Sequence, residues 1–197
     1  MNTYKKENEF YAGFLELKED HPDFKFQPAT VIARDPTDVF ASFTIDQGTL
    51  NGVAPNDPVI TADGLVGYIS EAGSTFSTVI TLYDPSLRVG AMDSRTRDAG
   101  IVSGGLSLAE EGYCRMSYLS RSSAITLGDL VITSGAGGVF PQGLLIGSVS
   151  EIKQESDDIS MYAVIKPAVN LDELRDVMVI TSFTGQGGIA DSSGEEE

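Results

Sequence analysis

The hydrophobic period of the chain changes after about twenty residues. In the opening stretch Phe10, Phe14 and Leu17 recur at i, i+4 and i+7, which places them on one helical face, and charged residues fill much of the other face. A helix this short is marginal by itself, so we expect its apolar stripe to pack on a partner helix or on the body of the protein. The pattern predicts an amphipathic helix within residues 1–23 that is the end of something longer.

From residue 24 onward the period becomes two, as in half-buried strands. The clearest run is Val39–Asp46, in which every second residue is apolar. Asp63-Gly64 lies between two apolar runs with almost no spare residues, which predicts a tight hairpin. The 21 glycines and 8 prolines also suit short strands joined by many turns. We therefore expect an all-β body.

One segment of this body occurs twice, 72 residues apart. Asp57–Thr61 (DPVIT) is followed by Gly64–Gly67 (GLVG), and Asp129–Thr133 (DLVIT) is followed by Gly143–Gly147 (GLLIG). The flanking strand candidates repeat as well, at roughly six per unit, which suits a small closed barrel without exposed strand edges. The sequence therefore predicts two six-stranded β-barrels in tandem, with the outline of the chymotrypsin-like double barrel.

The predicted organisation is the helix end over 1–23, a first β-barrel over 24–98, a second β-barrel over 99–183 and a disordered acidic tail over 184–197; this division allows the barrels to exchange strands. Glycines predicted to serve the turns are Gly48, Gly52, Gly64, Gly67, Gly135, Gly137, Gly138, Gly143 and Gly147.

Charge limits the partners of the protein. The 29 acidic and 13 basic residues give a formal net charge of −16, which repels nucleic acid and anionic membrane surfaces. The single cysteine, Cys114, cannot form an internal disulfide, and its alternating surroundings indicate a small buried residue rather than a reactive thiol. No apolar run reaches the roughly 18 residues that a membrane span needs.

The double-barrel outline raises the question of serine protease chemistry. The single histidine, His21, lies before both predicted barrels, so neither Ser103 nor Ser134 has an evident general base. We expect no catalytic residues and no enzyme activity, and an inactive or lysine-based protease-like double barrel stays open as an alternative.

The glycine-rich stretch from Ser134 to Gly143 resembles a phosphate-binding loop only superficially. It joins two strands, opens no helix and contains no cation. A wide hairpin is the simpler interpretation. Its candidate residues for contact with a partner protein are Val139, Phe140 and Pro141, which we expect to be exposed.

No cofactor or metal site is expected. There is no second histidine or cysteine pair, and Asp157-Asp158 and Asp172-Glu173 lack the spacing of a calcium loop. The chain has no tryptophan to form a carbohydrate platform, although a peptidoglycan-binding module stays open as a second alternative.

Seven motifs, taken in order and spacing, resemble the rod shape-determining MreC family over about residues 9–180. They are Ala29–Pro36, Thr44–Gly48, Asn51–Val53, Asp63–Gly67, Gly128–Gly135, Phe140–Gly143 and Lys166–Ala168. The resemblance implies the outer part of a single-pass membrane protein, with a coiled coil and two β-barrels on the extracytoplasmic face of the bacterial cytoplasmic membrane, in the periplasm or at the exterior of a Gram-positive cell. It also implies that the helix over residues 1–23 is the end of that coiled coil.

The same resemblance implies a function. It indicates a non-enzymatic scaffold of the cell-wall elongation complex, which maintains rod shape by linking the cytoplasmic actin-like filament system to peptidoglycan synthases. The implied partners are a second copy, in a homodimer or filament, a penicillin-binding transpeptidase and other membrane proteins of that complex, with the membrane reached through an N-terminal anchor.

Overall fold

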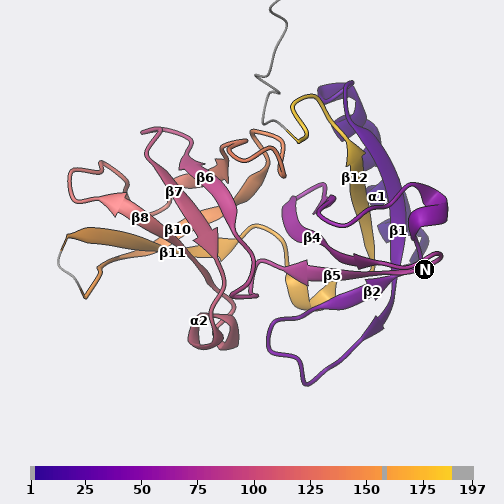
Figure 1. The fold of residues 1–197 in the computed structure, drawn as a ribbon, viewed down its shortest axis with the longest axis horizontal. Helices are drawn as coiled ribbons and strands as arrows, with labels where there is room; N and C mark the ends of the chain where they lie inside the picture. Colours follow the sequence, from indigo (N-terminus) through magenta and orange to yellow (C-terminus); the bar gives the residue numbers. More distant parts are fainter. Residues whose placement is uncertain (1–2, 157–158, 188–197) are drawn as a thin grey trace, which may run out of the picture.

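The computed structural model describes residues 3–156 and 159–187, which form two closed antiparallel β-barrels of six strands each, side by side (Figure 1). The predicted all-β fold with two six-stranded barrels is confirmed. In order around the first barrel, the strands are β1 (Lys25–Arg34), β12 (Asp176–Ser182), β3 (Pro58–Thr61), β4 (Gly64–Ala72), β5 (Ser77–Thr81) and β2 (Phe43–Ile45). In the second they are β10 (Leu145–Gln154), β11 (Ser160–Pro167), β8 (Cys114–Ser120), β7 (Ala99–Ser103), β6 (Val89–Asp93) and β9 (Leu130–Thr133).

The two barrels exchange one strand each. Residues 24–98 supply β1 to β6 and residues 99–183 supply β7 to β12, but the sixth strand of each half leaves its own barrel. Strand β12 pairs with β1 and β3, while β6 pairs with β7 and β9. The predicted boundary between residues 98 and 99 therefore divides two repeat units and not two barrels. The first barrel consists of β1 to β5 with β12, and the second consists of β6 to β11. Each barrel combines five strands of one unit with the last strand of the other.

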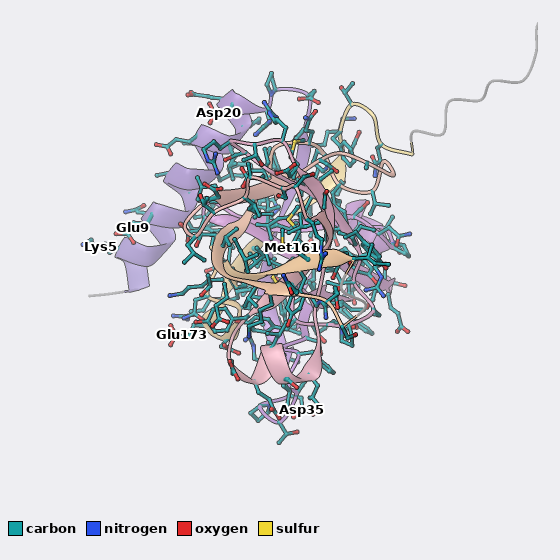
Figure 2. All side chains as sticks on the ribbon, turned by 90° about the vertical axis from the view of Figure 1, so that its left-hand side faces the viewer. Lys5, Glu9, Asp20, Asp35, Met161 and Glu173 are labelled. Carbon is teal, nitrogen blue, oxygen red and sulfur yellow. The ribbon has the colours of Figure 1, made fainter. Side chains whose placement is uncertain are left out.

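Helix α1 (Thr3–Asp20) packs on the outside of the first barrel. Phe10, Phe14 and Leu17 contact the core, and the Phe14 ring meets Phe26 of β1 edge to face, with 5.8 Å between centroids. The body of the protein thus covers the predicted apolar face. Figure 2 shows the helix along one flank, with Lys5 and Glu9 near one end and Asp20 at the other.

The helix approaches the barrel closely at one point. A Cβ atom added to Gly13 would lie 2.6 Å from the Cβ of Ala62, in the β3–β4 turn, so the contact requires glycine. Tyr11 and Leu15, on the adjoining face, remain 51% and 59% exposed. The remaining helical elements are short: α2 (Leu106–Glu110) and the 3₁₀ turns η1 (Thr49–Asn51) and η2 (Leu171–Glu173).

Two local predictions have contrasting outcomes. The hairpin at Asp63-Gly64 is confirmed, because Thr61 pairs directly with Gly64 in the β3–β4 ladder. The strand predicted over residues 39–46 is wrong for its first half. The Asp38 carboxylate accepts hydrogen bonds from the N–H groups of Phe40 (3.0 Å) and Ser42 (3.0 Å), which fixes a turn before β2 begins.

The predicted turn glycines fall into two groups. Positive φ angles occur at Gly52, Gly64, Gly135, Gly137, Gly138 and Gly143, but not at Gly48, Gly67 and Gly147. Gly67 and Gly147 occupy equivalent positions in β4 and β10, where an added Cβ would lie 1.7 Å from the Ile80 carbonyl oxygen and 2.0 Å from that of Lys166. In these strands glycine permits close backbone approach rather than a turn.

The prediction of disorder is wrong for residues 184–187. The Thr184 N–H donates to Asp23 Oδ2 (3.2 Å), and the Gly187 N–H donates to the Gly138 carbonyl (3.0 Å), so residues 184–187 are held against the body. The rest of that predicted tail, residues 188–197, lies outside the described residues, as do Asp157 and Asp158.

Candidate functional site

The predicted partner loop lies between β9 and β10, next to the first barrel. Phe140 is only 4% exposed, and its ring meets Tyr68 of β4 edge to face at 6.5 Å between centroids. Pro141 is buried too, and its carbonyl accepts a hydrogen bond from Thr133 Oγ1 (2.5 Å). The expectation that Phe140 and Pro141 are exposed is therefore wrong, because the loop fills the inter-barrel contact. Val139, at 37% exposure, alone of the three presents its side chain to solvent.

The candidate nucleophiles have no base beside them in the described part of the chain. Ser134 Oγ accepts the N–H of Ala136 (3.3 Å), and Ser103 is nearly buried in β7. His21 instead stacks on Phe24 at 4.4 Å between centroids, at the end of α1. Cys114 is fully buried as expected, and desolvation raises the pKa of its thiol to about 12, so it stays protonated. Within residues 3–156 and 159–187, no three acidic, His or Cys side chains are grouped to hold a metal ion.

The duplicated aspartates share a backbone role. The N–H of Ala54 donates to Asp57 Oδ2 (2.8 Å), and that of Thr126 donates to Asp129 Oδ2 (2.8 Å). The main-chain carbonyl of Asp57 accepts from the Ile69 N–H of β4, and that of Asp129 accepts from the Val149 N–H of β10, both at 2.9 Å. Each carboxylate therefore closes the turn before its Val-Ile-Thr strand.

Their electrostatic surroundings differ. Arg95 forms a two-point ion pair with Asp129, at 2.6 and 3.0 Å, and this bonding holds the pKa of Asp129 well below its usual range. Among the described residues Asp57 has no such partner, and it is 2% exposed. Desolvation raises its pKa to about 6, although the N–H of Ala54 and the Gln186 side chain oppose the shift. Met92 pairs with Ile132 in the second barrel, and Met178 pairs with the equivalent Ile60 in the first. Three positions after each methionine, the second barrel has Arg95 and the first has Thr181.

Two open grooves indent the surface. The larger, of about 740 Å³, lies between α1 and the first barrel and is lined by five carboxylates, including Asp63 and Glu173, with Arg175. The smaller, of about 390 Å³, lies on the second barrel and contains Arg88 and Tyr118. Neither residue was predicted from the sequence. Strict alternation from Cys114 directs Tyr118 into the barrel. A positive φ of 66° at Tyr118 reverses the alternation, so Tyr118 is exposed and Leu119 is buried.

The fold and these sites together define a class of protein: a two-barrel β domain, closed by strand exchange, whose described residues assemble no catalytic set. Comparison with known proteins identifies one family. The model of the family "Rod shape-determining protein MreC, barrel core" matches residues 31–181, and the chain belongs to the MreC family. Neither helix of the described residues combines the length and hydrophobicity that a membrane crossing takes.

Relatives of known sequence and structure agree with this assignment. The cell shape-determining protein MreC of Listeria monocytogenes is 31% identical over 192 residues, which is 96% of this chain and 64% of that protein. A solved Listeria monocytogenes MreC structure has a TM-score of 0.74 and 31% identity, covering 90% of this chain and 85% of that one. The MreC chain of a Helicobacter pylori complex with the penicillin-binding protein PBP2 has the same fold, with a TM-score of 0.63 at 16% identity over 81% of this chain and 99% of that one.

Proposed function

We propose that this chain is the extracytoplasmic part of a scaffold in the bacterial cell-wall elongation complex, and that it maintains rod shape through binding surfaces rather than an active site. Membership of the MreC family across the barrel core carries this proposal. The described geometry is consistent with it, because neither candidate serine has a base beside it among the described residues and Cys114 is buried in the core.

The proposed partner outside the membrane is a penicillin-binding transpeptidase. The support is the Helicobacter pylori complex, in which a chain of this fold is bound to PBP2. In the proposed arrangement an N-terminal anchor ahead of α1 holds the longer protein in the membrane and relays its position to the cytoplasmic actin-like filament system. The exposed Tyr11 and Leu15 of α1 are the residues through which a second copy would pair as a coiled coil.

Several large apolar side chains are available for a synthase. Leu50 and Phe76 lie on the first barrel at 77% and 54% exposure, and Leu127 lies on the second at 66%. Large exposed apolar side chains are among those that a partner protein buries when it binds.

Photo-crosslinking in cells tests the proposal. The full-length protein carries a photoreactive phenylalanine analogue at Leu50, Phe76, Leu127 or Val139, and matched controls carry it at the exposed polar positions Lys25 and Lys166. We expect crosslinks to a transpeptidase from at least one apolar position and from neither control. Absence of any synthase crosslink, together with unchanged elongation after deletion of the gene, would refute the scaffold function.

A further inference from the structure

The smaller groove is a positively charged site on a protein of net charge −16. It lies over β7 and β8 and the segment that leads into β6, with the partly buried Ile101 in its lining. Three charged side chains line it: Arg88, Arg115 and Glu155. Their pairing decides which charge is available to a ligand.

Arg115 and Glu155 neutralise each other and form a fixed wall. Their side chains are half-buried and ion-paired, the Arg115 Nε donates to Ser117 Oγ (2.9 Å), and the guanidinium lies 4.2 Å from the centroid of the Tyr162 ring. Arg115 is therefore committed to neighbours on three sides.

Arg88 supplies the available charge. Its side chain is exposed, and in the part of the chain that the structure describes its guanidinium makes one hydrogen bond, from Nη1 to the Pro85 carbonyl (3.2 Å). The remaining N–H groups are those that bind a carboxylate with two parallel hydrogen bonds. Ser103 lines the same groove.

Tyr118 provides an aromatic surface beside this cation. It is 73% exposed, and in the described ranges it is the one aromatic residue among four non-glycine residues with positive φ. A bulky residue in this backbone region is strained, and such strain is retained where it positions a side chain for binding. Here it turns the ring out of the barrel and into the groove.

We infer that this groove binds an acidic peptide segment of a partner protein, with a carboxylate on Arg88 and an adjacent apolar side chain against Tyr118 and Ile101. A neutral saccharide fits the groove less well, because it would leave the Arg88 charge without a counter-charge. This chemistry is independent of the cell-wall role proposed above.

Titration of the full chain tests the inference, with amide chemical shifts as the readout. The probe is acetyl-Ala-Leu-Phe-Asp-Ala-amide, its isosteric control has Asn in place of Asp, and glucuronic acid supplies a carboxylate on a sugar. We expect saturable shifts at Ile101, Arg115 and Tyr118 with the Asp peptide, and affinity weaker by about tenfold for the Asn peptide, as for loss of a charged hydrogen-bond pair. Glucuronic acid is expected to bind more weakly than the Asp peptide.

Variants separate binding from folding. Arg88→Gln is expected to weaken binding of the Asp peptide about tenfold, whereas Arg97→Gln, an exposed arginine in the β6–β7 turn outside the groove, is expected to leave it unchanged. Tyr118→Gly relieves the positive φ, so we expect a higher melting temperature together with weaker binding. Equal affinity for the Asp and Asn peptides, no saturable binding, wild-type affinity in Arg88→Gln or Tyr118→Gly, or tighter binding of glucuronic acid each overturns the inference.

Discussion

Replacement of the two equivalent aspartates is expected to change stability in opposite directions at neutral pH. Burial raises the pKa of Asp57 from its usual 3.8 to about 6, so the folded state holds this proton more tightly than the unfolded state does. As the pH rises from about 4 to about 6, the unfolded chain releases the proton first, and this carboxyl removes stability. The loss is complete above the folded pKa.

The size of the loss follows from the two pKa values. The difference between 3.8 and about 6 corresponds to about 3 kcal/mol, at about 1.36 kcal/mol for each pKa unit. Partial solvation of the carboxylate reduces this value, so we expect Asp57→Asn to raise the free energy of unfolding at pH 7 by about 1 to 3 kcal/mol. The amide retains an oxygen that can accept the Ala54 N–H.

Asp129→Asn is the matched control. Arg95 holds the pKa of Asp129 low, so its charged form stabilises the fold, and removal of that charge is expected to destabilise the protein at pH 7. Urea unfolding between pH 4 and 8, followed by far-UV circular dichroism because the chain has no tryptophan, compares both variants with the parent. Destabilisation by Asp57→Asn at pH 7, or a parent-like slope between pH 4 and 6, would show that burial does not control this carboxyl.

Three further predictions concern the fold. Fragments 1–98 and 99–197 are each expected to remain unfolded alone and to fold when mixed, giving dispersed amide signals, because each barrel contains strands of both fragments. A fragment that folds by itself would contradict the exchange. Gly67→Ala is expected to cost about 3 kcal/mol in urea unfolding because its Cβ meets the Ile80 carbonyl, whereas Gly105→Ala, with no atom within 4 Å, should cost little. Phe140→Ala is expected to cost about 3 to 4 kcal/mol and Val139→Ala under about 0.5, and similar costs would place Phe140 outside the core.

Features that depend on neighbouring residues were predictable from the sequence. The face of α1 and the Asp63-Gly64 hairpin follow from spacing and turn chemistry within a few residues. The turn before β2 was not predictable from alternation, because the Asp38 carboxylate outcompetes the strand for the N–H groups of Phe40 and Ser42.

Features that depend on distant contacts were not predictable. An apolar sixth strand could complete either barrel, so its position depends on which open sheet edge it reaches. The pattern of apolar residues within the strand does not indicate which edge that is. Phe140 illustrates the same limit: a large residue in a glycine-rich loop is expected at the surface, but Tyr68 of the other barrel covers it. Tyr118 is exposed because one backbone angle reverses the alternation of β8.

The chain crosses between the two barrels twice. Strands β6 to β11 all lie in the second barrel, and the chain then returns to place β12 in the first barrel, between β1 and β3. The segments between β5 and β6 and between β11 and β12 therefore both join the barrels, and the Phe140 ring packs on Tyr68 across the contact. Two connections and a buried contact restrict the relative movement of the barrels more than a single flexible linker would. The acidic groove beside α1 and the Arg88 groove on the second barrel carry opposite charge, so two partners of opposite charge that bound these grooves would be kept near one another.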